Sequence, residues 1–296
     1  MALHGLTKAY PGGRGITDVS FRVGPGEVFG YLGPNGAGKS TTIRHLMGFL
    51  RPDRGRAEIN GMDCWRDAAR VQAAVGYLPG EIGFPEDMTA TQLLDLLARM
   101  RGLPAGRDRC RDLCDRFALD PCAAIRKLSK GNKQKVALVA AFRHTPDVLI
   151  LDEPTSGLDP LMQRRFLELI GEERARGATV LMSSHSFDEV ERVADRVGIL
   201  KEGRLVAVED VGRLRQVRRK VFTIATARDQ DVTALEHVGF PVVARREREV
   251  ELEVQGDYTA FVRALARFEL RSLDVRPLDL EEIFMHYYAP EEAQAR

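Results

Sequence analysis

Short, continuous apolar runs separated by helix-like stretches predict an α/β protein. Residues 16–32 hold two β-like runs around a Gly-Pro-Gly turn, and residues 148–151 and 179–182 form two more. A continuous apolar run of this length is typical of a parallel strand that is buried on both faces. The chain is therefore expected to build its main core on such a sheet.

A helical stretch is inserted between these strands. Thr89 and Gln92 have the spacing of a capping box, and they precede leucines whose spacing gives one apolar face. Helix-like sequence continues over residues 107–117. We expect a helical subdomain at about residues 82–145, in which most of the leucines close the local core.

The pattern changes in the last third of the chain. A basic stretch at residues 212–219 is expected to be a linker or a solvated helix face. Strand-like and helix-like segments follow it in the order βαββαβ. We predict a main α/β domain at residues 1–211 and a small α+β accessory domain of ferredoxin-like type at residues 220–296.

Composition and charge narrow the class of protein. The chain has 296 residues, which is long for one domain. Lysine and arginine total 44 against 43 acidic residues, so the formal charge of +1 gives no reason to expect a nucleic-acid partner. No apolar stretch approaches the ~18 residues that a membrane-spanning helix needs. The membrane part of any transporter is expected to be another polypeptide.

The cysteines and the N-terminus predict a reducing compartment. Cys64, Cys110, Cys114 and Cys122 form no paired C-x-x-C pattern, and no cationic, apolar leader opens the chain. Reduced thiols and a cytosolic location are therefore expected.

Residues 33–41 (GPNGAGKST) match the phosphate-loop pattern G-x-x-x-x-G-K-[ST] between a strand-like run and a possible helix. A glycine-rich surface turn is the alternative. In a phosphate loop, glycines let N–H groups approach phosphate oxygens, the lysine neutralises the β- and γ-phosphates, and the hydroxyl ligates Mg²⁺. The predicted nucleotide-binding residues are Gly33, Pro34, Asn35, Gly36, Ala37, Gly38, Lys39, Ser40 and Thr41, and Ser40 is also a predicted metal ligand.

Two acidic residues follow directly after the apolar run at residues 148–151. Asp152 and Glu153 lie at the carboxyl end of a predicted buried strand, where ligands bind in doubly wound sheets. We expect Asp152 to hold Mg²⁺ through water and Glu153 to orient and deprotonate an attacking water. An acid pair that caps a nearby helix is the alternative.

With these motifs the chain resembles the nucleotide-binding subunits of ABC transporters over roughly residues 3–211. Residues 128–132 (LSKGN) resemble the family signature LSGGQ at the leucine, the serine and the second glycine. A helix expected over residues 132–141 would place Ser129 and the Gly131 amide at its positive end, although Ser129 would serve equally as an ordinary N-cap. The resemblance implies that this tip binds the γ-phosphate of ATP held by a second ATP-binding subunit.

Three further residues match the family by position. Asp159, in the sequence SGLD, resembles the D-loop that runs along the dimer contact. His185 resembles the switch histidine that contacts the γ-phosphate, and with Lys39 and Glu153 it completes the predicted catalytic set. Tyr10, shortly before the first β-like segment, resembles the aromatic that stacks on adenine; simple packing is the alternative.

Two positions depart from the family. Gly80 occupies the place of a glutamine that touches Mg²⁺ and transmits the nucleotide state to the membrane subunit. Either the adjacent Glu81 substitutes for it, or the segment couples without a direct metal ligand. Lys130 places a cation where a small residue is usual.

The resemblance implies a P-loop ABC core with antiparallel β and helical subdomains, which binds ATP and Mg²⁺ and dimerises on ATP. It implies export of a drug, antibiotic, ionophore or lipid-like molecule through a separate transmembrane permease, at the cytoplasmic face of the plasma membrane. Residues 280–288 resemble the C-terminal extension of exporter subunits. One alternative is an importer subunit. A second is a regulator that binds ATP without hydrolysing it, which would be expected to lack the acid Glu153. A third is a soluble ABC ATPase of translation or DNA repair, which would need a second cassette or a long heptad run.

Overall fold

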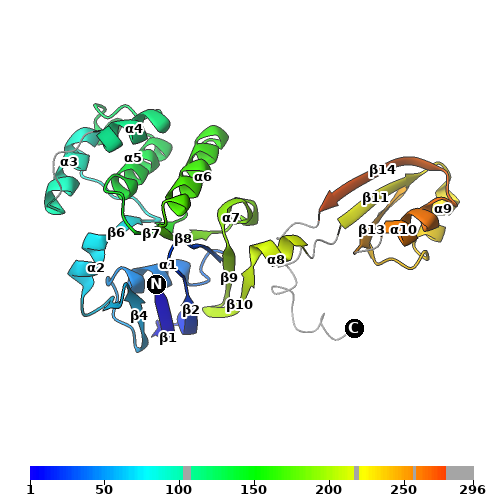
Figure 1. Ribbon diagram of the computed structural model, residues 1–296, viewed down its shortest axis with the longest axis horizontal. Coiled ribbons are helices and arrows are strands. Elements are labelled where there is room, and N and C mark those ends of the chain that lie inside the picture. The colour runs from blue at the N-terminus through cyan, green and yellow to red at the C-terminus, as the bar shows by residue number, and fades with distance from the viewer. Residues whose placement is uncertain (103–107, 217–219, 256–257, 278–296) are drawn as a thin grey trace. The chain divides into compact units, whose positions relative to one another are not determined.

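The computed structural model describes residues 1–102, 108–216, 220–255 and 258–277. Its contacts divide the chain into two compact units, Met1–Val211 and Gly212–Arg296 (Figure 1). Among the described residues, no helix is both long enough and apolar enough to cross a membrane.

A six-stranded sheet lies at the centre of the first unit. Its strand order is β10-β9-β3-β8-β7-β6, and all neighbours run parallel except the antiparallel pair of β9 and β10. Every residue of β3, β7 and β8 is buried, which explains the apolar runs that these strands contain. The strands are β3 (Val28–Leu32), β6 (Val75–Leu78), β7 (Val148–Asp152), β8 (Thr179–Ser184), β9 (Arg196–Lys201) and β10 (Arg204–Asp210).

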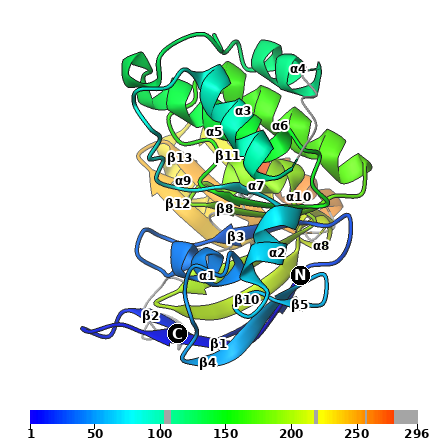
Figure 2. The same ribbon diagram turned by 90° about the vertical axis from the view of Figure 1, so that its left-hand side faces the viewer.

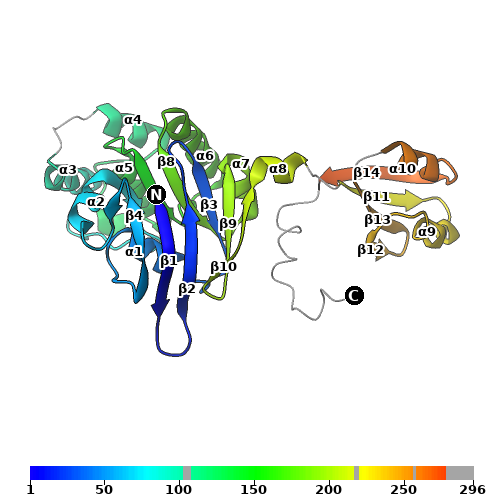
Figure 3. The same cartoon turned by 60° about the horizontal axis from the view of Figure 1, so that its bottom comes forward.

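A four-stranded antiparallel sheet forms a second layer. Its order is β2-β1-β4-β5, and β1 and β2 form a long hairpin beside β4 (Figure 3). Phe21 of β2 stacks on Phe29 of β3 with ring centroids 4.8 Å apart, so the two sheets share one apolar core. The strands are β1 (Ala2–Ala9), β2 (Gly15–Arg22), β4 (Arg54–Ile59) and β5 (Met62–Asp63).

Helices cover both faces of the six-stranded sheet. Helix α1 lies between the two sheets, whereas α3, α4, α5 and α6 gather on the opposite side (Figures 1 and 2). The helices of this unit are α1 (Lys39–Leu46), α2 (Ala68–Ala74), α3 (Ala90–Met100), α4 (Asp108–Arg116), α5 (Lys130–Phe142), α6 (Pro160–Ala175) and α7 (Phe187–Val193), with a 3₁₀ turn at Ile125–Lys127. Helix α8 (Val211–Gln216) begins at the last residue of the unit and continues into the second unit.

Helix α3 begins as its sequence predicts. The Thr89 side chain accepts a hydrogen bond from the Gln92 N–H, and the Gln92 side chain accepts one from the Thr89 N–H. This reciprocal pair is the predicted capping box, and it satisfies two backbone donors that a helix start leaves free. Leu93 and Leu94 of the apolar face are buried, as expected for leucines that close the local core.

Two predicted boundaries are wrong. Tyr10 follows the first strand instead of preceding it, because β1 occupies Ala2–Ala9. Gly5 has a φ of 58° and the β1–β2 register shifts between Leu3 and Leu6, so the strand lacks the strict alternation that reveals a strand in sequence. Helix α5 starts at Lys130 rather than at residue 132, because Ser129 already accepts the hydrogen bond of its first turn.

The second unit has the predicted order βαββαβ. Its antiparallel sheet has the order β12-β13-β11-β14, and two helices pack on the side where Ile224, Leu252 and Phe261 form a separate core. Residues 280–288, predicted to form a C-terminal extension, lie outside the described residues. The elements are β11 (Lys220–Thr226), α9 (Asp229–Leu235), β12 (Val242–Arg246), β13 (Glu249–Val254), α10 (Tyr258–Leu265) and β14 (Leu270–Pro277).

Candidate functional site

The loop between β3 and α1 has the conformation of a phosphate cradle. Gly36 and Gly38 have φ values of 82° and 108°, in the left-handed region that glycine adopts without strain. A side chain at Gly38 would come within 2.6 Å of Ile16, and one at Gly33 within 2.6 Å of the Leu200 carbonyl oxygen. Gly33 is therefore required by packing, and Gly38 is required both by packing and by its backbone conformation.

A pocket of about 290 Å³ opens beside this loop. Tyr10, Arg14 and Gly15 line one part of it, and Glu153 lines another. Tyr10 is half-buried there, in a position where its ring can meet a base. Two of the predicted loop residues, Gly33 and Ala37, do not line this pocket. Those that line it are Pro34, Asn35, Gly36, Gly38, Lys39, Ser40 and Thr41.

The Lys39 ammonium is buried at the bottom of the loop. Its side chain is 6% exposed, and Nζ donates to the Gly33 carbonyl oxygen at 2.6 Å. Nζ also lies 3.1 Å from Glu153 Oε1. That carboxylate oxygen is buried and has no aligned hydrogen bond, so the ion pair is loose. A buried cation that is only partly balanced favours an anionic ligand.

The two acids at the end of β7 are fixed by Ser183 of β8. The Ser183 hydroxyl donates to Asp152 Oδ1 at 2.5 Å and accepts from the Glu153 N–H at 3.0 Å. Glu153 itself has a φ of 49°, an unusual conformation for a residue with a side chain, which turns its carboxylate towards Lys39. His185 Nδ1 lies 2.6 Å from Glu153 Oε2. Lys39, Glu153 and His185, the three predicted catalytic residues, are thus in contact with one another through Glu153.

Asp152 and Ser40 line a second, adjoining pocket of about 330 Å³. A carboxylate and a hydroxyl that face one space are oxygen donors of the kind Mg²⁺ prefers, so the residues fit the predicted metal. Gly80 and Glu81 line the same pocket, and a side chain built at Gly80 would lie 3.0 Å from Asp152 Oδ2. Burial and the nearby Asp152 carboxylate raise the pKa of Tyr77 in this pocket to about 12.

The signature-like residues lie apart from the Lys39 pocket. Ser129 is exposed at the N-terminus of α5, and neither it nor Gly131 is among the residues that line the pocket. A side chain at Gly131 would lie 2.4 Å from the Gly157 carbonyl oxygen, so the tip of α5 rests against the SGLD loop. Asp159 of that loop accepts the Met162 N–H at 2.9 Å and caps α6.

Three residues contact the site although the sequence predicted no role for them, even though Gln134 lies in the signature-like segment and Ser183 lies two residues before His185. Ser183 bonds both acids from a neighbouring strand, and Arg14 lines the pocket beside the phosphate loop from the loop between β1 and β2. Gln134 of α5 is 3% exposed and donates to the carbonyl oxygens of Glu153 and Pro154. Each acts across a tertiary contact, which no local pattern reports.

The chain matches a protein-family model described as "ABC transporter" over residues 16–156, and a second model described as an AAA domain over residues 123–190. It is similar to the linearmycin resistance ATP-binding protein of Bacillus subtilis, with 31% identity over 95% of this chain and 96% of the relative. It is similar to the Nod factor export ATP-binding protein I of Paraburkholderia xenovorans, with 34% identity over 95% of this chain and 94% of the relative.

Two solved structures are also similar to this chain. A structure described as the ATP binding subunit of an ABC transporter is 35% identical, with a TM-score of 0.68 over 73% of this chain and 91% of the other. A bacterial ABC transporter cassette at 22% identity and a TM-score of 0.65 shares the fold over 71% of this chain.

Replacing Ser183 with alanine is expected to weaken Mg²⁺-ATP binding and to lower the unfolding free energy by about 1–3 kcal/mol, since two buried polar groups lose their partner. Ser184→Ala is the matched control, because Ser184 is equally buried but bonds Glu189 and the Ser186 N–H. Calorimetric titration and chemical denaturation would measure both effects. Equal losses of Mg²⁺-ATP affinity in the two variants would contradict a specific effect of Ser183 on the acids.

Proposed function

The chain belongs to the ABC transporter ATP-binding family and is an ATPase, and on this premise we propose that it powers export of a small molecule through a separate transmembrane permease. The observation that supports hydrolysis best is the contact chain from Lys39 through Glu153 to His185. It brings a phosphate-binding cation, an acid and an imidazole to one end of the sheet.

The hydrolytic step follows from the charges in this site. Phosphate oxygens of ATP would replace Glu153 as the partner of the Lys39 ammonium, because they carry more negative charge. The freed Glu153 carboxylate then orients a water and accepts its proton as the water oxygen bonds the γ-phosphorus and the bond to ADP breaks. His185 Nδ1 lies 2.6 Å from Glu153 Oε2, and we propose that the histidine positions this acid and contacts the γ-phosphate of bound ATP.

Ser40 and Asp152 would hold the metal ion that accompanies the nucleotide. When bound, Mg²⁺ offsets phosphate charge and orients the phosphate oxygens. The bond between Ser183 and Asp152 keeps one carboxylate oxygen occupied, so Asp152 would approach the metal through its other oxygen or through water. Gly80 offers no side chain to the metal, and Glu81 lines the same pocket as Ser40 and Asp152.

A second copy of the ATP-binding subunit would complete the site. The exposed Ser129 hydroxyl and the amides at the start of α5 form a positive helix end. This end lies outside the pocket of its own chain, and therefore we propose that it binds the γ-phosphate held by a partner, whether an identical or a related subunit. Asp159 would lie along the same contact.

The direction of transport is proposed from relatives. The two relatives that span nearly the whole chain carry names of antibiotic resistance and of Nod factor export, which favours export of a drug, antibiotic or lipid-like molecule over import. The permease would select the substrate. It would also hold this subunit at the cytoplasmic face of the plasma membrane.

Glu153→Gln is expected to lower ATP turnover by about 10²–10⁴-fold, the contribution typical of a general base, while ATP binding persists. The variant should accumulate as an ATP-bound dimer in size-exclusion chromatography. Lys39→Ala is the control, because it removes the phosphate-binding cation and should abolish both binding and dimerisation. Unchanged turnover in Glu153→Gln would refute the proposed chemistry.

Cysteines at Asn35 and Ser129 are expected to cross-link between two chains when ATP is bound. The pair would be introduced together with Glu153→Gln, and Cys110 and Cys122 would be replaced by serine so that accessible native thiols do not react. A short bismaleimide and denaturing electrophoresis would detect the covalent dimer. The dimer should form with ATP and not with ADP or with either cysteine alone. Monomer under all conditions would exclude the head-to-tail arrangement.

The subunit is expected to co-purify with a membrane protein. Mild detergent extraction of native cells, followed by affinity purification and mass spectrometry, should identify a polytopic partner in stoichiometric amount. Ribosomes or nucleic acid in its place would favour the alternative of a soluble ABC ATPase.

A further inference from the structure

The two places where the chain departs from the family pattern line one pocket. Gly80 and Glu81 stand where the family has its glutamine, and Lys130 stands where a small residue is usual. Glu81 and Lys130 both line a pocket of about 440 Å³ between the loop after β6 and the start of α5. The other residues that line it are Gly80, Ile82, Leu128, Lys133 and Gln134. An acid and a base therefore share this pocket at the two unusual positions.

Both of these charges are unpaired in the structure. The Glu81 and Lys130 residues are exposed, and among the described residues neither side chain makes an ion pair or a hydrogen bond. Lys133 lines the same pocket, but its ammonium lies 3.6 Å from a carboxylate oxygen of Glu86. Glu81 and Lys130 are thus the opposite charges of this pocket that remain to be satisfied.

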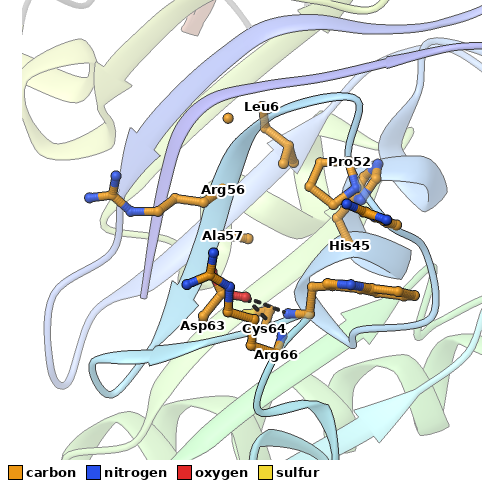
Figure 4. Close-up of a pocket in the computed structure, with 11 residues that line it drawn as sticks. Leu6, His45, Pro52, Arg56, Ala57, Asp63, Cys64 and Arg66 are labelled. Carbon is orange, nitrogen blue, oxygen red and sulfur yellow. Dashed lines mark hydrogen bonds between the residues drawn. The ribbon is translucent and has the colours of Figure 1, made fainter.

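An acid in another pocket of the first unit is bonded, in contrast to Glu81. That pocket has a volume of about 200 Å³ and lies beside β1 and β4 (Figure 4). Its acidic residue, Asp63, accepts the N–H groups of Trp65 and Arg66 through Oδ1 at 3.0 and 2.9 Å. These bonds fix the direction of the Asp63 carboxylate, whereas the Glu81 carboxylate can turn towards the side with the more favourable charge.

Gly80 and Glu81 form a wall between two pockets. They line the pocket at the start of α5 and also the pocket on the Asp152 side. Asp152 and Glu153 on that side repel a carboxylate, although Arg44 also lines it. Among the described residues that line the α5 side, Glu81 is the one acid and faces two lysines. The Glu81 carboxylate is therefore favoured on the α5 side.

The start of α5 favours an acid as its partner. A helix start is the positive end of the helix dipole, so a negative charge is stabilising there. None of the described residues in the first turn of α5 is acidic, and Lys130 adds a positive charge. The Lys130 side chain lies along the SGLD loop, because its Cγ is 3.6 Å from the position that a Cβ at Gly157 would take. An unbalanced cation thus lies directly beside Ser129.

ATP strengthens the preference of Glu81 for the α5 side. The pocket beside the phosphate loop and the pocket on the Asp152 side share Ser40 and Glu153 in their linings. ATP with its magnesium ion stays net negative, so its binding adds negative charge on one side of the wall that Gly80 and Glu81 form. Repulsion then drives the Glu81 carboxylate towards Lys130.

We propose that Glu81 and Lys130 form an ion pair when ATP binds, and that this pair positions the tip of α5. Because Ser129 precedes Lys130, the pair fixes the hydroxyl that binds the partner's γ-phosphate. Glu81 and Lys130 are positioning residues, since neither contacts the reacting atoms. The role of Ser129 rests on the proposed function, whereas the pairing itself requires only that ATP binds to this chain.

Charge reversal tests the pair, with the ATP turnover of the full chain as the measurement. Glu81→Lys and Lys130→Glu should each lower turnover about threefold to thirtyfold, because each brings like charges together across the pocket. The double variant restores opposite charges and should return to within about threefold of the wild type. Turnover in the double variant that is no higher than in the single variants would overturn the proposal.

Two other cations provide matched controls. Lys133 lies nearly one turn further along α5 and pairs with Glu86, and Arg44 lines the pocket on the Asp152 side. Lys133→Glu or Arg44→Glu, each combined with Glu81→Lys, should give no recovery of turnover. Recovery with either of them would overturn the assignment of Lys130. A raised Mg²⁺ requirement in Glu81→Gln that Lys130→Glu leaves unchanged would also overturn it, because Glu81 would then be a metal ligand.

A cross-link within one chain separates this proposal from dimer formation. Ile82→Cys and Lys133→Cys place thiols on the two sides of the pocket and leave Glu81 and Lys130 in place. Glu153→Gln would retain ATP, and Cys110 and Cys122 would be replaced by serine. A short bismaleimide should link the thiols faster with ATP than without nucleotide, as measured by mass spectrometry of the chain.

The acceleration by ATP should disappear when Lys130→Glu is added to this chain. Equal rates with and without ATP would overturn the pairing, even if the dimer forms. Acceleration in a chain that stays monomeric would support the pairing and would refute only the role of Ser129 in a dimer.

Discussion

The buried ammonium of Lys39 is the charge around which the first unit is organised. At 6% exposure it must be balanced from within the protein, since an unpaired charge in the interior costs several kcal/mol. Glu153 supplies the balance from the end of β7 at 3.1 Å. The loops after β3 and β7 meet because the two strands run parallel and end at the same edge of the sheet, with β8 between them.

The need to balance the Lys39 charge also explains the unusual backbone conformation of Glu153. Glu153 adopts a φ of 49° to direct its carboxylate at Lys39, a conformation that costs on the order of 1–3 kcal/mol. Two buried contacts hold it: Ser183 accepts its N–H, and Gln134 donates to its carbonyl oxygen. The strain is therefore located at the residue proposed to handle the proton, and its support comes from β8 and α5.

Local sequence patterns were enough to predict those parts of the structure that depend on residues close together in the sequence. The phosphate loop, the acids of β7 and the capping box at Thr89 are all encoded within a few positions, and the structure has them where the sequence predicts. Strand β1 was missed because its bulge at Gly5 breaks the alternation, which in turn misplaced Tyr10. Ser183, Gln134 and Arg14 could not be predicted, because their importance arises from contacts between elements far apart in the chain.

The glycine at position 80 changes how the helical region can communicate with the acids. A side chain there would meet Asp152 Oδ2 at 3.0 Å, so the loop after β6 approaches the carboxylate by its backbone. Gly80, Glu81 and Gln134 line one pocket of about 440 Å³ with Lys130. Because Gln134 also bonds the backbone of Glu153 and Pro154, a displacement of α5 would be transmitted directly to the acid end of β7. The hydrogen bonds of Gln134 therefore connect α5 to the acid end of β7 without a side chain at position 80.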